Sequence, residues 1–259
     1  MTSLLLTLGL SATAVALFAY SGRLSVLTEF GTPLRAAVAT VLLVLVLSVA
    51  VFLPVVAYGE ADSLDPSELS LPMVFFGHYV LILFLMAWWR LRRDSVSLAE
   101  FLHVGSWQWP WLRDGVLTGV WGWLLAVTMN VTLGSILGSA GALPSSEGAP
   151  EIVTWLVELS TGAKLLIIGM AMTVEEGFFR GFLQPRFGFW PTNVLFALGH
   201  FSYGLPFLVV GVFTVSFVLG KTFERSRNLV PCIVGHGVFD GIQLFIILPI
   251  AVSAMNGAG

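Results

Sequence analysis

Long apolar runs separated by short polar segments make up most of this chain. Because a helix needs about 20 apolar residues to cross a bilayer, these runs predict an all-α, polytopic transmembrane helical bundle of about eight spans. Residues 1–259 then form a single membrane domain. The pattern leaves open whether residues 191–220 form two spans or one broken hairpin. The predicted spans are Ser3–Tyr20, Ala37–Tyr58, Met73–Trp89, Gly115–Ala140, Ala163–Gln184, Pro191–Tyr203, Leu205–Gly220 and Val230–Ala251.

The composition agrees with a membrane protein. The chain is 57% hydrophobic and only 10% charged, with a mean hydropathy of +0.92, whereas soluble domains carry about a quarter charged residues. A net charge of −3 supplies no basic field for nucleic acid, so we expect a lipid bilayer and no nucleic acid as surroundings. The single cysteine, Cys232, excludes an internal disulfide framework and a thiolate zinc cluster.

The charges of the loops predict an orientation. The second and fourth loops, around Glu60–Glu68 and Glu147–Glu151, contain no Lys or Arg. Because basic residues stay on the cytoplasmic side, we predict that the odd-numbered loops face the cytoplasm. The short loops fit an integral protein of a prokaryotic plasma membrane. The basic residues of the odd-numbered loops are Arg23, Arg35, Arg90, Arg92, Arg93, Arg113, Arg186, Lys221, Arg225 and Arg227.

The third loop has a composition of its own. Ser95–Leu112 mixes Phe101, Trp107, Trp109 and Trp111 with charges. Aromatic residues next to an arginine cluster are typical of a helix that lies among lipid headgroups. We predict an interfacial helix here.

Ionisable residues inside three late spans are the main functional signal. Each such residue costs roughly 2.5–3.5 kcal/mol on insertion scales, so a cluster of them inside the membrane indicates a function. At helical rise they lie at similar depths in the cytoplasmic half of the bilayer, which predicts one site within core spans 163–251. The cluster comprises Glu175, Glu176 and Arg180 in the fifth span, His200 in the sixth, and His236 and Asp240 in the eighth.

Helical spacing separates the roles of the two glutamates. Glu176 and Arg180 are four residues apart and can pair, which favours a structural clamp. Glu175 lies about 100° round the helix from Glu176. It therefore lacks that local partner, and we predict that it is unpaired and faces a cavity.

The other polar residues form two i,i+4 pairs. The Asp240 carboxyl can accept the N–H of His236 and orient its ring, although the pair taken alone fits a satisfied core contact equally well. Phe196 and His200 share a helical face, which places an aromatic wall beside the imidazole. His78, alone on an apolar helix, is predicted to be a core or interhelical hydrogen-bonding residue. Three glycines are predicted to allow close helix approach, namely Gly235, Gly237 and Gly241.

At these residues the chain resembles the CAAX protease and bacteriocin-processing family of intramembrane endopeptidases, also called Abi-type proteins. The family signatures are Glu-Glu-x-x-x-Arg, Phe-x-x-x-His and His-x-x-x-Asn or Asp. They stand here, in that order, as Glu175-Glu176-Gly-Phe-Phe-Arg180, Phe196-Ala-Leu-Gly-His200 and His236-Gly-Val-Phe-Asp240. The resemblance covers about residues 163–251.

The resemblance implies hydrolysis of peptide bonds in membrane-associated peptide or protein substrates, in a helical bundle whose cavity opens to the cytoplasm. Glu175 would activate water with the help of His200, and His236 and Asp240 would stabilise the oxyanion. Glu176 and Arg180 would brace the site. An ionised aspartate cannot donate a hydrogen bond, so Asp240 is either protonated or orients His236.

Other functions are compatible with the same residues. Glu175, His200, His236 and Asp240 also form an acceptable zinc set, although binding all four would leave no separate base; we therefore expect no cofactor, with zinc as the alternative. A proton-coupled transporter could use the same groups as a relay, and an immunity or scaffold protein could keep the fold without the chemistry. The sequence does not identify the substrate or say whether it is prenylated.

Overall fold

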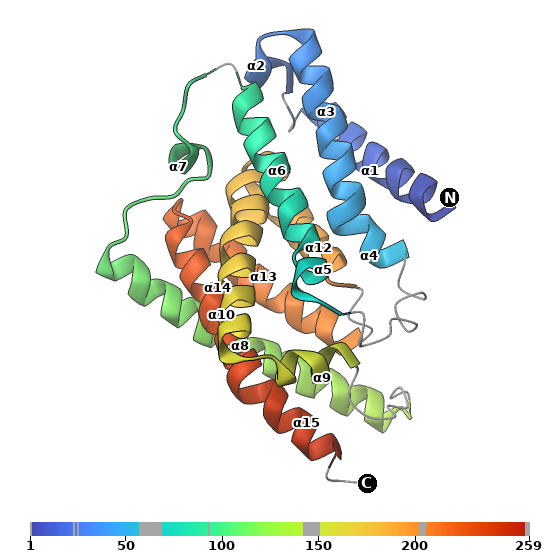
Figure 1. The fold of residues 1–259 in the computed structure, drawn as a ribbon, viewed down its shortest axis with the longest axis vertical. Helices are drawn as coiled ribbons and strands as arrows, with labels where there is room; N and C mark the ends of the chain where they lie inside the picture. Colours follow the sequence, from blue (N-terminus) through green and yellow to red (C-terminus); the bar gives the residue numbers. More distant parts are fainter. Residues whose placement is uncertain are drawn as a thin grey trace.

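The computed structural model describes residues 2–22, 24, 26–56, 69–92, 94–141, 151–201 and 206–256. Every regular element within these ranges is a helix (Figure 1), which confirms the all-α fold. The first half contains α1 (Thr2–Tyr20), α2 (Val26–Phe30), α3 (Pro33–Leu47), the π-helical η1 (Ser48–Phe52), α4 (Leu53–Val56), α5 (Leu71–Val74), α6 (Phe76–Leu91), α7 (Leu98–Phe101) and α8 (Trp109–Ser139).

The second half carries the predicted site. It contains α9 (Glu151–Glu158), α10 (Thr161–Met170), the π-helical η4 (Ala171–Glu175) and η5 (Gly177–Leu183), α11 (Gln184–Phe187), α12 (Phe189–Gly199), α13 (Pro206–Ser226), α14 (Val230–Ile242), the π-helical η7 (Gln243–Ile247) and α15 (Leu248–Asn256).

The helices make this an integral membrane protein, but they do not confirm a count of eight spans. Within the described ranges, four helices are long and apolar enough to cross a bilayer: Ser3–Tyr20, Pro33–Val56, Trp109–Ser139 and Val230–Met255. A fifth candidate is the pair Ile152–Glu158 and Thr161–Phe187, which is bent by 119°. The predicted third and sixth spans are helices of only 16 and 11 residues. The junction of the predicted sixth and seventh spans, at Gly204, lies outside the described residues.

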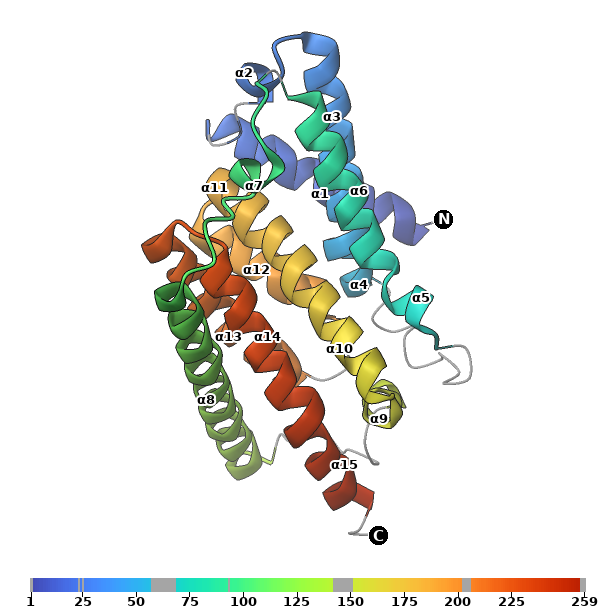
Figure 2. The same cartoon turned by 60° about the vertical axis from the view of Figure 1, so that its left-hand side comes forward.

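The odd-numbered loops meet at one end of the bundle, as Figure 2 shows for α2, α7 and α11 at the opposite end from α9 and α15. Glu29 of α2 accepts hydrogen bonds from Arg92 at 3.3 Å and from Arg186 at 2.9 Å. The backbone N–H of Gly105 donates to the side chain of Asn228 at 3.0 Å. These contacts join the first, third, fifth and seventh loops. Arg23 and Arg93 lie outside the described residues.

The prediction of an interfacial helix over Ser95–Leu112 is wrong. Only the four residues of α7 are helical before α8 begins at Trp109. Phe101 is buried and lies under the Arg186 guanidinium, 5.7 Å from its ring centroid, because the core offers the ring more apolar contact than the surface does. Trp107 and Trp109 are exposed.

An aromatic cluster fixes α6 against the helix that carries the two glutamates. The Phe84 ring packs edge-on against Phe178 and Phe182, and Trp88 packs against Phe182. Phe178, Phe182 and Trp88 are fully buried. Edge-to-face packing adds to the burial of large rings, so this cluster sets the position of α6 beside the site.

On the opposite side α8 lies directly against α14. A Cβ on Gly119 would meet the Gly235 carbonyl oxygen at 2.5 Å, and one on Gly115 would meet Val234 at 2.6 Å. Gly235 and Gly237 are closely approached, as predicted, whereas Gly241 has open space. Small residues therefore allow the contact between α8 and α14.

Candidate active site

One continuous helix, Thr161–Phe187, carries the first motif and changes its winding there. The α-helical α10 gives way to the π-helical η4, which ends at Glu175, and to η5, which begins at Gly177. Wide π turns inside a helix often mark functional sites. Glu175, the last residue of η4, and Glu176, which lies between η4 and η5, face different neighbouring helices.

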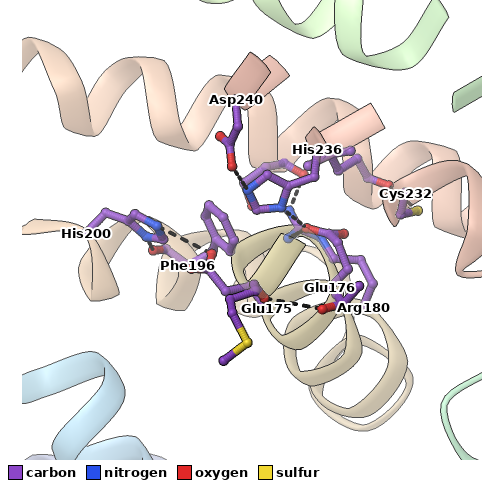
Figure 3. A network of polar contacts seen from close by, with 12 residues as sticks. Glu175, Glu176, Arg180, Phe196, His200, Cys232, His236 and Asp240 are labelled. Carbon is purple, nitrogen blue, oxygen red and sulfur yellow. Dashed lines mark hydrogen bonds and ion pairs between the residues drawn. The ribbon is translucent and has the colours of Figure 1, made fainter. Parts of the chain in front are cut away.

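Glu176 lies at the centre of a fully buried cluster (Figure 3). Its Oε1 accepts from Arg180 Nη1 at 2.7 Å and from His236 Nδ1 at 2.8 Å. Neither the Glu176 nor the Arg180 side chain is exposed. Arg180 also donates to the Ser216 hydroxyl at 2.9 Å and lies over the Phe196 ring at 4.5 Å. The pair expected from the i,i+4 spacing is present, and it also reaches His236 and Ser216.

Glu175 faces the other way and is not unpaired, so that prediction is wrong. Its Oε1 lies 3.1 Å from His78 Nε2, and its Oε2 lies 3.5 Å from His200 Nε2. Both contacts come from other helices, α6 and the end of α12. The angular positions of residues around one helix do not indicate which residues of other helices will contact them.

The surroundings of His200 fix which of its nitrogens carries a proton. Nδ1 lies 2.8 Å from the Phe196 carbonyl oxygen, which can only accept, so Nδ1 is the donor. In the neutral ring Nε2 then carries the lone pair and faces Glu175. The expected aromatic wall is present, because the Phe196 ring stacks on His200 at 4.5 Å between centroids.

His236 is held between two carboxylates. Its Nδ1–H donates to Glu176, and its Nε2 lies 3.4 Å from Asp240 Oδ2. The shorter contact is the one to Glu176, so Glu176 contributes more to the orientation of the ring than the i,i+4 spacing to Asp240 suggests. For Nε2 to donate as well, the ring must carry both protons.

The structure brings the residues of all three motifs into one region, where the labelled side chains of Figure 3 come from Thr161–Phe187, from α12 and its C-cap, and from α14. It adds His78, whose contact with Glu175 is an interhelical hydrogen bond. The sequence contained one signal for His78, namely an imidazole inside an apolar run. No residue three or four positions away pairs with it, so the sequence did not indicate which helix it would contact.

The zinc alternative needs Glu175, His200, His236 and Asp240 to converge on one ion. In the structure Glu175 contacts His200, whereas His236 lies between Glu176 and Asp240. Among the described residues, no three His, Cys, Asp or Glu side chains are grouped so that they could hold a metal. The observed arrangement does not fit a zinc ion.

Comparison with known proteins identifies the segment that holds the motifs. Residues 158–242 match the family described as type II CAAX prenyl endopeptidase Rce1-like. Over 69 residues, 26% of this chain, the sequence is 36% identical to YpbD, an uncharacterised protein of Bacillus subtilis (strain 168). The match spans 36% of the length of YpbD. No solved structure matches the chain. The match to the Rce1-like family model covers all three motifs, which confirms the resemblance drawn from them.

Proposed function

We propose that this protein is an intramembrane endopeptidase that hydrolyses peptide bonds of membrane-associated peptides or proteins. The observation that carries the proposal is the close approach of Glu175 Oε2 to His200 Nε2, which lie 3.5 Å apart. The match of residues 158–242 to a family of prenyl endopeptidases supports the same class of reaction.

The two facing atoms suit a shared water molecule. With His200 neutral, an ionised carboxylate oxygen and a nitrogen lone pair face each other, and both can only accept hydrogen bonds. A separation of 3.5 Å is long for a direct hydrogen bond. One water can donate an O–H to each atom, which leaves its own lone pair directed at a substrate carbonyl carbon.

The reaction then follows from general acid–base catalysis. Glu175 takes a proton from the water while the water oxygen bonds to the carbonyl carbon, giving a tetrahedral oxyanion. Glu175 returns the proton to the leaving nitrogen, and the C–N bond breaks. Glu175 is thus both the base and the acid of the reaction, and His200 keeps the water in place.

His236 and Asp240 are the proposed oxyanion-stabilising groups. A doubly protonated His236 donates from Nδ1 to Glu176 and from Nε2 toward the oxyanion. Asp240 Oδ2, at 3.4 Å from Nε2, holds the ring before substrate binds. Glu176 and Arg180 support the site by fixing His236 and Phe196.

The test is cleavage by matched variants. Glu175→Gln and His200→Ala should abolish proteolysis while both proteins insert and melt like wild type, whereas Glu100→Gln, an exposed glutamate on α7, should cleave normally. A comparison of the membrane proteomes of cells with wild type and Glu175→Gln identifies a substrate, which is then cleaved by purified protein in detergent. Wild-type cleavage by both site variants would overturn the proposal.

The same purified protein tests the metal-free mechanism. We expect far less than one zinc per active chain, and activity that strong chelators leave intact. Asp240→Asn should keep its activity, because an amide can still hydrogen-bond at this position. Near-stoichiometric zinc, with activity lost on chelation and restored by zinc, would require the zinc mechanism instead.

A further inference from the structure

His78 is the partner of Glu175 that lies outside the Rce1-like segment. It belongs to α6, 97 residues before Glu175, and its Nε2 lies 3.1 Å from Glu175 Oε1. The two side chains are only 14% and 13% exposed. The other ring nitrogen, Nδ1, is buried without a hydrogen-bond partner among the described residues.

The direction of this hydrogen bond follows from the chemistry of its partners. An ionised carboxylate has no proton to give, so His78 Nε2–H is the donor and Oε1 is the acceptor. Oε1 is therefore already engaged, and Oε2 is the oxygen that faces His200. The contact distinguishes the two carboxylate oxygens and limits rotation of the Glu175 carboxylate.

This hydrogen bond is not needed to dock α6. Phe84 and Trp88 already pack into the aromatic cluster with Phe178 and Phe182, and the ion pairs of Glu29 fix the end of the helix. Since Nδ1 is buried without a partner among the described residues, an imidazole is a costly residue for packing alone at this position.

We infer that His78 is a positioning residue of the active site, which holds Glu175 Oε1 so that Oε2 is presented to the water shared with His200. This inference rests on the proposed function. It adds α6 to the helices that build the reactive centre, and it makes one carboxylate oxygen the anchor and the other the base.

Three substitutions at residue 78 separate positioning from packing. His78→Gln keeps an N–H donor at the place of Nε2, His78→Asn keeps a donor but is too short to reach, and His78→Leu removes it. We expect kcat to fall by about 10- to 100-fold in the Asn and Leu variants, as for a misplaced catalytic group. KM should stay within about twofold, and Gln should restore most of kcat. Wild-type kcat in His78→Leu, or a Gln variant as impaired as Leu, would overturn the inference.

A second measurement does not depend on activity. In a thermal-unfolding cycle, His78→Leu and Glu175→Leu remove the two ends of one hydrogen bond, so the double variant should lose less in Tm than the sum of the singles. Additive losses would refute the contact, and with it the role of His78, whether or not the protein is a protease. Lack of cleavage by wild type, with coupling intact, would instead contradict the proposed function.

Discussion

A single carboxylate oxygen, Glu176 Oε1, accepts hydrogen bonds from both Arg180 and His236. With neither Glu176 nor Arg180 exposed, each charge depends on the other. Removing one partner of a buried pair leaves an uncompensated charge, which is far more damaging than losing a surface ion pair. At the scale of residues, we therefore expect this cluster to determine stability, whereas Glu175 with its two histidines carries the chemistry of the proposed mechanism.

Substitutions in this cluster should thus affect folding. Glu176→Gln and Arg180→Gln should each reduce the free energy of unfolding by about 3–5 kcal/mol, seen as poor expression and an early thermal transition in detergent. Ser216→Ala is the uncharged control, because Arg180 Nη2 keeps the Ser216 carbonyl oxygen at 3.1 Å and only the hydroxyl's bond to Asn193 Oδ1 is also lost; we expect a loss of about 1–3 kcal/mol. Normal stability of both charge variants with activity lost would place Glu176 and Arg180 in the catalytic set.

The sequence predicted contacts within a helix and missed contacts between helices. The Glu176–Arg180 pair and the Phe196–His200 stack follow from the i,i+4 geometry of one helix, and both are present. The contact of Glu175 with His78 depends on how α6 packs against η4. Local spacing carries no information on that packing, so Glu175 was wrongly predicted to be unpaired.

At the scale of elements, the approach of α8 to α14 is set by glycine. The backbone of α14 at Gly235 lies where a side chain on Gly119 would have to go. Because α14 carries His236 and Asp240, the separation of these two helices sets the position of half the site.

Gly119→Ala should therefore force the helices apart. We expect a loss of about 1–3 kcal/mol in the free energy of unfolding, as for overpacking of a core, together with reduced cleavage. Gly169→Ala in α10, where a Cβ meets nothing within 4 Å, should be neutral or slightly stabilising. Equal melting temperatures for the two variants would show that the bundle relaxes freely around Gly119.

Element boundaries were predicted less well than element type. Each predicted apolar run coincides with helix in the described ranges, because a backbone in lipid has no water to bond to and a helix pairs its N–H and C=O groups within the segment. Length decides whether such a helix crosses, and Phe189–Gly199, with 11 residues, covers only about 16 Å. The aromatic third loop does not form the predicted interfacial helix, because Phe101 packs into the core. Composition alone does not indicate such a tertiary contact.

At the scale of the whole molecule, the joined odd-numbered loops allow a direct test of orientation. Cys232 is fully buried, so a membrane-impermeant maleimide should leave wild type unlabelled. Ser95→Cys, in the third loop, should react only after cells are permeabilised, whereas Thr161→Cys, at the opposite end, should react in intact cells; both positions are exposed. The reverse pattern would contradict the predicted cytoplasmic side.

The contact of α6 with the site determines which residues a chimaeric protein would have to carry together. A chimaera that exchanged only residues 158–242 would carry Glu175 away from His78, and the aromatic cluster would lose Phe84 and Trp88. The new host would have to supply an imidazole, and a complementary ring surface, at the same height. The segment that matches the family model is therefore smaller than the unit that a functional graft would have to carry, and that unit extends back to include Phe76–Leu91.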